Sequence, residues 1–367
     1  MNTQIKNITN LKRLINNKSI QKILILSGKN SYYKTGADKF FQEILKKKEF
    51  FLYLKQSYLP ELNELEKILK IKERFKPDLI LAIGGGCVMD LAKVGSLLKL
   101  SKNLREKVIN SDFNSKKIKV LAIPTTAGSG AEVTSNAIIY IKKVKYSVEG
   151  DKIKPDFFYL IPKFLMSSSS SLDATAGFDA ISQSVESMFS QKSNEESLAF
   201  SKRSLKILLE NSVNFINKKN ITNAHKMSVG ANLAGRAISI SKTIAPHALS
   251  YSFTTMYGIP HGHAVSLSFN QILKFNHHHQ NKATCNYNLT KRYETLFKLT
   301  KTKNILELDK YFISLKKSLK LEQNFHKLGI DFKKDCFKII DGINNQKLKN
   351  NPVALVKEDF PLIFEKF

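Results

Sequence analysis

Short apolar runs alternate with amphipathic stretches through the first third of the chain. Four runs have the length and composition of buried strands: residues 22–27, 50–54, 78–83 and 119–123. Two stretches between them have the apolar spacing of helices: residues 36–48 and 59–75. Alternating strands and helices predict a parallel sheet covered on both faces, and ligands of such sheets bind at the carboxyl ends of the strands.

The pattern changes after Pro162. Before it, residues 137–141 and 144–148 are predicted to form a hairpin, and residues 157–161 a last strand. The serine run at residues 167–171 indicates a linker or a helix N-terminal cap. Beyond it, the apolar positions predict helices at residues 172–190, 195–217, 222–240, 244–256, 262–276, 287–300 and 304–317. We therefore expect an α/β dinucleotide-binding domain over residues 1–165 and an all-helical metal- and substrate-binding domain over residues 166–367.

Length and composition agree with two domains. The chain has 367 residues, 42% of them hydrophobic, which is enough for two cores of ordinary size. No run of about eighteen apolar residues occurs and the amino terminus has no apolar signal core, so we expect a cytoplasmic protein with no membrane partner. The three cysteines, Cys87, Cys285 and Cys336, have unrelated spacings, which argues for reduced structural thiols and against a disulfide framework.

The net charge of +28 raises the question of nucleic-acid binding. Only six residues are arginine, although arginine forks are favoured for phosphate and base recognition. The lysines are scattered along the chain. A solvated basic surface is therefore favoured over a specific nucleic-acid site, and both interpretations predict nonspecific association with polyanions at low salt.

Two loops rich in small residues follow predicted strands. Gly84, Gly85 and Gly86 precede a helix that begins near Val88, where exposed backbone N–H groups can bind a pyrophosphate. A plain glycine turn is the alternative, but Asp90 and Lys93, one helical turn apart, favour binding. The second loop, residues 124–134, supplies the hydroxyl groups of Thr125, Thr126 and Ser129, which suit a dinucleotide phosphate.

A candidate metal site lies in the second half of the chain. His247 and His261 are fourteen residues apart, and the break at residues 257–260 allows a helical His247 and a loop-borne His261 to converge. Asp179 and Gln183 are four residues apart and share one face of a helix. Together they predict an Asp/Gln/His/His site for a divalent ion.

These motifs resemble the iron-containing (group III) alcohol dehydrogenase family. Residues 84–93 resemble its GGGSxxDxAK element, with Cys87 in place of the usual serine, and residues 124–134 resemble its PTTAGTGSEVT loop. Residues 177–186 are similar to its GMDALTHAIE helix and residues 260–262 to its PHG turn. The resemblance extends from about residue 20 to the end of the chain. It implies a dehydroquinate synthase-like fold, with a Rossmann-like parallel sheet followed by a helical domain.

The resemblance also implies a nicotinamide dinucleotide in a cleft between domains and a divalent metal, iron(II) or zinc, held by one aspartate and three histidines. Asp179, His247 and His261 match three of those ligands, and Gln183 falls where the family usually has a histidine. A neutral amide oxygen there shifts the site toward metals that prefer oxygen ligands and weakens binding.

The sequence does not identify the proton donor, because Tyr251 replaces a histidine that the family often has four residues after the first metal-binding histidine. Tyr251, His263 and a water chain are the candidates, and the alternative for His263 is a structural histidine. The tract His277, His278 and His279 indicates a solvated segment rather than a second metal site.

The loop after the first strand bears on the choice of cofactor. Family members with an aspartate there are incompatible with a 2′-phosphate, whereas residues 27–31 contain Lys29 and no carboxylate. We therefore expect NADPH to be favoured over NADH. The predicted cofactor-binding residues are Gly28, Ser31, Gly84, Gly85, Gly86, Cys87, Asp90, Lys93, Thr125, Thr126 and Ser129.

The predicted substrate-binding residues are Arg236, Lys242 and Thr243, which precede His247 in the sequence. Two cations and a hydroxyl group near a catalytic ion suit an anionic substrate. The alternative is that Arg236 and Lys242 are ordinary surface cations. Residues 235–251, 257–267 and 344–355 resemble the phosphonoacetaldehyde reductase / 2-hydroxyethylphosphonate dehydrogenase branch, which implies reduction of phosphonoacetaldehyde. The competing interpretations are a broad-specificity alcohol or aldehyde dehydrogenase, a lyase like the sugar-phosphate cyclases, and a non-catalytic dinucleotide-binding relic. The resemblance further suggests a homodimer or larger assembly.

Overall fold

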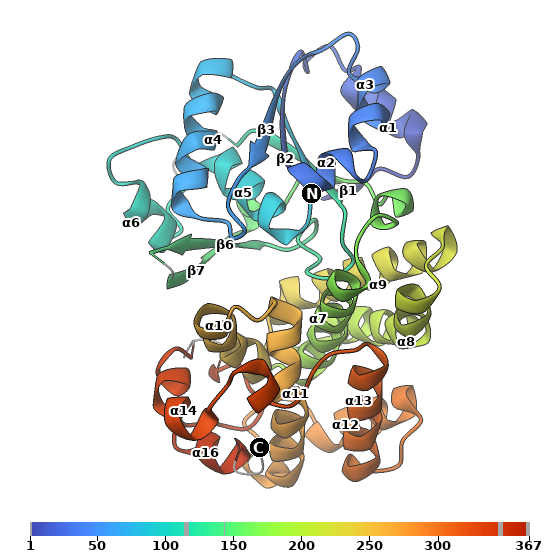
Figure 1. The fold of residues 1–367 in the computed structure, drawn as a ribbon, viewed down its shortest axis with the longest axis vertical. Coiled ribbons are helices and arrows are strands. Elements are labelled where there is room, and N and C mark those ends of the chain that lie inside the picture. Colours follow the sequence, from blue (N-terminus) through green and yellow to red (C-terminus); the bar gives the residue numbers. More distant parts are fainter. Residues whose placement is uncertain (1, 114–116, 143, 344–347, 365–367) are drawn as a thin grey trace. The chain divides into compact units, whose positions relative to one another are not determined.

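The chain divides into two compact units in the computed structural model. Unit 1 comprises residues 1–126 and 130–168, and unit 2 comprises residues 127–129 and 169–367. The structure describes residues 2–113, 117–142, 144–343 and 348–364 (Figure 1). The first four residues of the predicted 344–355 segment therefore lie outside the described residues. None of the described helices is both long enough and apolar enough to cross a membrane.

Unit 1 is built on a six-stranded sheet in the order β1-β8-β5-β4-β2-β3, with every pairing parallel. Its strands are β1 (Thr3–Gln4), β2 (Lys22–Gly28), β3 (Glu49–Lys55), β4 (Leu79–Gly84), β5 (Lys119–Pro124) and β8 (Phe157–Phe158). A separate antiparallel hairpin pairs β6 (Asn136–Ile141) with β7 (Val144–Glu149). The parallel sheet and the hairpin confirm the predictions from the apolar pattern.

Both faces of the sheet are buried, because successive residues of a strand point to opposite sides. In β2, Leu24 and Leu26 join the core beneath α4 and α5, whereas Ile23 and Ile25 join the core beneath α1 and α3 (Figure 1). The helices of unit 1 are α1 (Ile8–Ile15), α2 (Lys29–Tyr33), α3 (Ala37–Ile44), α4 (Leu62–Phe75), α5 (Gly86–Leu97) and α6 (Leu104–Ile109), with 3-10 turns η1 (Asp151–Ile153) and η2 (Pro162–Leu165).

Three local predictions in unit 1 were wrong. The last strand ends at Phe158 rather than Ile161, because the chain then turns into η2 at Pro162. The residues after β2 form the short helix α2 rather than a loop. The glycines are not all in a loop either: Gly84 ends β4, Gly85 is the N-cap and Gly86 begins α5.

The described secondary structure of unit 2 is helical, apart from one isolated β-bridge between Ala283 and Val353. Its helices are α7 (Ser170–Phe189), α8 (Glu195–Asn217), α9 (Ile221–Ser241), α10 (Ala245–Tyr257), α11 (His261–His278), α12 (Leu289–Thr300), α13 (Ile305–Ser318), α14 (Phe332–Asp341) and α16 (Asp359–Phe364), with 3-10 turns η3 (Gln280–Lys282) and η4 (His326–Leu328). Helix α7 packs against α8, α9 and α11, and α10 packs against α11. Ser169, in the serine run, caps α7 by accepting a hydrogen bond from the Leu172 N–H.

Candidate functional site

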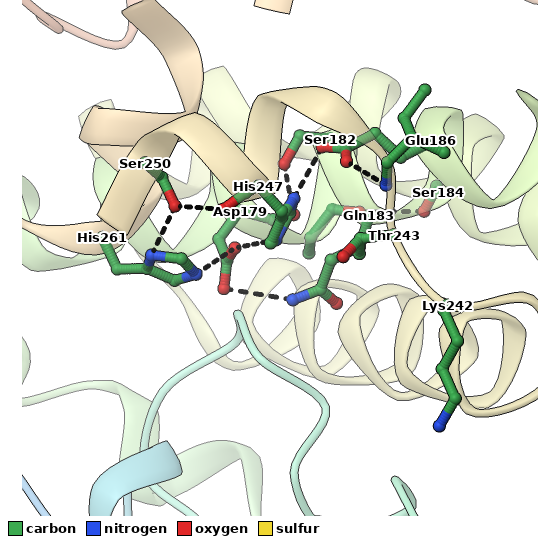
Figure 2. A network of polar contacts seen from close by, with 12 residues as sticks. Asp179, Ser182, Gln183, Ser184, Glu186, Lys242, Thr243, His247, Ser250 and His261 are labelled. Carbon is green, nitrogen blue, oxygen red and sulfur yellow. Dashed lines mark hydrogen bonds and ion pairs between the residues drawn. The ribbon is translucent and has the colours of Figure 1, made fainter. Parts of the chain in front are cut away.

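Three side chains from three helices of unit 2 converge in a geometry suited to a metal ion (Figure 2). Asp179 lies on α7, His247 on α10 and His261 at the start of α11. One ligand atom from each lies within 4.8 Å of the others. The Nε2 atoms of His247 and His261 are 3.3 and 3.9 Å from Asp179 Oδ1. The structure thus brings together three of the four predicted metal ligands.

The turn between α10 and α11 carries His261 toward α7. Gly258 ends α10 with φ 67°, a left-handed conformation that glycine adopts without strain. Pro260 caps α11, so His261 is the first residue of a helix and not part of a loop, which corrects the prediction. A Cβ on Gly262 would lie 2.0 Å from the Thr175 carbonyl oxygen, and it would also crowd Asp179. Only glycine permits this close approach of α11 to α7.

Gln183 lies one helical turn after Asp179 on α7 and is 3% exposed. Its Nε2 donates a hydrogen bond to Asp179 Oδ2 at 3.2 Å. This contact leaves the other carboxylate oxygen, Oδ1, facing the two histidines. The amide is therefore placed beside the three-residue cluster, where the fourth ligand was predicted.

The polar atoms of this cluster are suited to a divalent cation. Asp179 Oδ1, Gln183 Oε1 and His247 Nε2 are buried and have no hydrogen-bond partner in the described part of the chain. Buried polar atoms are nearly always paired, so an unpaired Gln183 Oε1 beside Asp179 Oδ1 and His247 Nε2, which face each other at 3.3 Å, indicates a missing ligand. A carboxylate, an amide oxygen and two imidazoles form a donor set that fits iron(II) or zinc.

A second carboxylate, that of Glu186, orients His247. Glu186 is fully buried on α7; its Oε1 lies 2.6 Å from His247 Nδ1, and its Oε2 accepts a hydrogen bond from the Ile244 N–H at 2.8 Å. Burial alone would lower the pKa of His247, but the carboxylates of Glu186 and Asp179 raise it to about 9. The site therefore favours positive charge. With the Nδ1 proton held by Glu186, His247 would give up its Nε2 proton to a bound cation and ligate through that nitrogen.

Glu186 and Ser250 were not predicted from the sequence to have a role in the site. Ser250 Oγ lies 3.3 Å from His261 Nδ1, so it can orient the second imidazole in the same way. Glu186 is seven residues, or two helical turns, after Asp179, and Ser250 is one turn after His247. Spacing thus places each on the ligand-bearing face of its helix but does not show which side chain it contacts.

The two candidate proton donors lie in different surroundings. Tyr251 is buried on α10, and its ring centroid is 6.4 Å from that of His261. His263 is outside the three-residue cluster, and its Nε2 lies 2.6 Å from the carbonyl oxygen of Glu322. Burial lowers the pKa of His263, which disfavours its charged form. Of the two side chains, Tyr251 thus lies beside a residue of the cluster, whereas the His263 ring is engaged with Glu322.

The predicted substrate residues lie near the end of α9 and in the segment that leads into α10. The Arg236 Nε donates to Asn232 Oδ1 at 3.0 Å, and its guanidinium lies over the Phe200 ring at 5.9 Å. Lys242 is the C-cap of α9, and Thr243, which follows it, is 5% exposed. In Figure 2 the Lys242 side chain extends away from Asp179. These contacts hold the Arg236 guanidinium against residues of α8 and α9. Lys242 and Thr243 remain predicted substrate residues.

The predicted cofactor residues of unit 1 gather at the carboxyl ends of β2, β4 and β5. The order of the strands reverses between β2 and β4, which is where open α/β sheets bind ligands. Thr125 Oγ1 donates to Ser31 Oγ at 3.3 Å, and a Cβ on Gly28 would lie 3.7 Å from the same Ser31 oxygen. A Cβ on Gly85 would lie 3.2 Å from Thr126 Oγ1. These residues share one edge of the sheet. Ser129, which was also predicted to bind the cofactor, belongs to unit 2 instead.

The first turns of α5 add a charged pair, of which Lys93 is fully buried. Lys93 Nζ donates to Thr134 Oγ1 at 2.7 Å and to the Asn136 carbonyl at 2.8 Å, and it lies 3.9 Å from Asp90. Burial lowers the pKa of Lys93 to about 8 and raises that of Asp90 to about 6. Burial also raises the pKa of Cys87 to about 11, so the thiol stays protonated and neutral in place of the serine.

Sequence comparisons find relatives among alcohol dehydrogenases. The aldehyde-alcohol dehydrogenase 2 of Entamoeba histolytica is 27% identical over 71% of this chain and 32% of its own length. The phosphonoacetaldehyde reductase of Streptomyces viridochromogenes is 30% identical over 55% of this chain and 54% of its own. The chain thus spans between about a third and about half of these curated relatives.

The fold is similar to that of solved structures as well. The crystal structure of sulfoacetaldehyde reductase from Bifidobacterium kashiwanohense in complex with NAD+ covers 100% of this chain and 96% of its own, with a TM-score of 0.88 and 19% identity. This likeness confirms the predicted two-domain fold. Residues 3–162 match the model for iron-containing alcohol dehydrogenase, and residues 173–367 match that for the C-terminal part of the Fe-containing alcohol dehydrogenase family. The chain therefore belongs to the iron-containing alcohol dehydrogenase family.

Proposed function

We propose that this protein is a metal-dependent, NAD(P)H-linked reductase of a small aldehyde. The observation that carries the proposal is the cluster of Asp179, His247 and His261, whose ligand atoms lie within 4.8 Å of one another. The orphaned Gln183 oxygen beside it completes a set of four donors. A protein that only binds dinucleotides would not need these metal-ligating atoms. Burying polar atoms without hydrogen-bond partners lowers the stability of the fold, so their presence favours a metal site.

The chain's own residues would hold and orient the reactants. When bound, the metal supplies Lewis-acid polarisation of the aldehyde oxygen and the nicotinamide supplies the hydride. Asp179, Gln183, His247 and His261 would hold the ion, and Glu186 would keep a proton on Nδ1 of His247. The alcohol product requires one proton, for which Tyr251, His263 and water remain the candidate donors.

Phosphonoacetaldehyde is the proposed substrate. Support comes from the relative with that printed activity and from Lys242, whose ammonium suits the anionic tail of such an aldehyde. NADPH is the proposed cofactor. Its support is Lys29, which is exposed just after β2 in a segment without a carboxylate, so a 2′-phosphate would meet a cation there.

Steady-state rates with two aldehydes test the proposal. Purified protein loaded with iron(II) or zinc is given phosphonoacetaldehyde or propanal, each with NADPH and with NADH. We expect kcat/KM to be at least about tenfold higher for the phosphonate, the discrimination that one charge-assisted contact provides. Equal values for the two aldehydes would refute the anionic substrate. A lack of turnover by the metal-loaded protein with every pair would refute the reductase itself.

A further inference from the structure

Lys242 ends α9 in a backbone conformation that only glycine usually adopts. Its φ is 64° and its ψ is −179°. Two other helices end on a lysine with positive φ, but Lys76 and Lys301 have ψ values of 61° and 38°, within the left-handed helical region that other residues tolerate. The Lys242 conformation is strained, and such strain persists only where the surroundings impose it.

A buried asparagine imposes this turn. The Asn350 side-chain amide donates to the carbonyl oxygen of Ser241 at 3.0 Å and to that of Thr243 at 2.9 Å. These two carbonyls flank Lys242, so a single nitrogen holds both sides of the strained residue. Asn350 is 6% exposed, and its own carbonyl accepts a hydrogen bond from the Gln191 N–H at 2.9 Å. The clamp is therefore anchored in the core of unit 2.

Helix α7 and its C-cap, Ser190, hold the same segment as well. Ser190 Oγ donates to the Ser241 carbonyl, and Ser241 Oγ donates to Ser187 Oγ at 2.8 Å. Glu186 accepts from the Ile244 N–H with one carboxylate oxygen and contacts His247 with the other (Figure 2). The position of Lys242 is thus fixed by the same helix that carries Asp179.

We infer that Asn350 is a positioning residue for substrate choice: it holds Lys242 in the strained turn, which fixes the lysine as the cation that receives the anionic tail of the aldehyde. This inference rests on the proposed function. A glycine at position 242 would form the turn without strain, so a lysine there needs a reason other than folding. The lysine charge provides that reason.

The Lys242→Gly variant separates strain from recognition. We expect its melting temperature to rise by about 1–3 °C, because the strain is removed. The ratio of kcat/KM for phosphonoacetaldehyde to kcat/KM for propanal should fall about 10- to 100-fold, because a charge-assisted contact is lost. A lower melting temperature would refute the strain, and an unchanged ratio in an enzyme that prefers the phosphonate would refute the role of Lys242.

A double-mutant cycle tests Asn350 itself. Asn350→Ala should lower the same ratio about fivefold or more in the wild-type background, and it should lower it no further in the Lys242→Gly background. Asn350→Ser, which keeps one donor, serves if the alanine variant does not fold. Asn351→Ala is the matched control, since this buried amide donates to Asn276 and Val353 and not to the turn; we expect lower stability with the ratio retained.

The possible results distinguish the positioning role of Asn350 from the proposed phosphonate substrate. A wild-type enzyme that does not prefer the phosphonate refutes the proposed substrate, and the role of Lys242 with it. A wild-type preference that Asn350→Ala leaves intact, or lowers equally in both backgrounds, refutes only the positioning role of Asn350.

Discussion

At the scale of single residues, Glu186 connects the metal ligands to the segment before them. Its two oxygens contact His247 Nδ1 and the Ile244 N–H, so one buried carboxylate orients a ligand and anchors the start of α10. Partners of this kind fix the tautomer of a ligating imidazole and make it a better ligand. Metal affinity should therefore depend on a residue that does not contact the ion.

Glu186→Gln tests this dependence. The amide keeps the size of the side chain but loses the negative charge that holds the His247 proton, so affinity for zinc should fall about 10- to 100-fold. Competition with a chromophoric chelator measures it. Glu195→Gln is the matched control, because that carboxylate is 92% exposed at the start of α8. An equal, small effect of both substitutions would show that Glu186 does not support the metal site.

Gln183 determines how strongly the ion is held. Replacing it by histidine supplies the imidazole that the family usually has at this position, so affinity for zinc should rise about tenfold or more, whereas Gln183→Ala should lower it. The same chelator competition measures both variants. Identical affinities in the wild type and both variants would show that position 183 lies outside the coordination sphere.

Single residues differ in how far the sequence could predict them. Asp179, His247 and His261 carry ligand chemistry in recognisable motifs, so the sequence alone indicates them. Glu186 and Ser250 act through partners on other helices, and a helical period alone does not show which face meets which neighbour. Lys242 is notable in the sequence for its charge, but its strain depends on Asn350, more than a hundred residues away along the chain.

At the scale of elements, the site depends on how closely α7 and α11 pack. A Cβ on Gly262 would lie 2.0 Å from the Thr175 carbonyl, which is backbone and unable to move aside. Gly262→Ala should therefore separate the two helices and draw His261 away from Asp179. The expected cost is about 3 kcal/mol of unfolding free energy or more, with loss of tight metal binding.

Urea unfolding and metal titration of Gly262→Ala measure the two effects. Gly177→Ala on α7 is the control, because its Cβ would meet only the flexible end of Met227 at 3.3 Å. We expect Gly177→Ala to change the free energy of unfolding and the metal affinity much less than Gly262→Ala does. Metal binding that survives in Gly262→Ala would contradict the close-packing requirement.

Element types were predictable because the periodicities are long and clear. The helices of unit 2 agree with their predicted ranges to within about two residues, as expected where an apolar period runs over several turns. Errors occurred at short or irregular segments, such as β8 and α2, where a few residues carry too little pattern. The predicted start of α11 is one residue late, which assigns His261 to the preceding loop; Pro260 breaks α10 but is also the N-cap of α11, and proline is favoured near helix starts.

At the scale of the whole molecule, a buried lysine makes stability depend on pH. Lys316 on α13 is 4% exposed and donates to the Ser266 carbonyl at 3.1 Å; burial lowers its pKa to about 7. The unfolded chain keeps that proton up to a pKa of about 10.4. Between these values the unfolded state binds more protons, so stability should rise with pH, by up to about 1.4 kcal/mol per unit.

Urea unfolding at pH 7, 8 and 9 tests this sign. Lys316→Met removes the titrating group while keeping much of the apolar stem, so its stability should rise less with pH than that of the wild type. The comparison cancels the effect of the other charges of this basic chain. Parallel pH dependences in the two proteins would show that Lys316 stays protonated in the fold.

The most direct test of the central claim is the metal content of the purified chain after incubation with iron(II) or zinc and gel filtration. A site formed by Asp179, Gln183, His247 and His261 predicts about one ion per chain in the wild type and almost none in His261→Ala, with its fold retained by circular dichroism. A wild-type chain that retains neither ion, or a His261→Ala variant that retains as much as the wild type, would contradict a metal centre at this position.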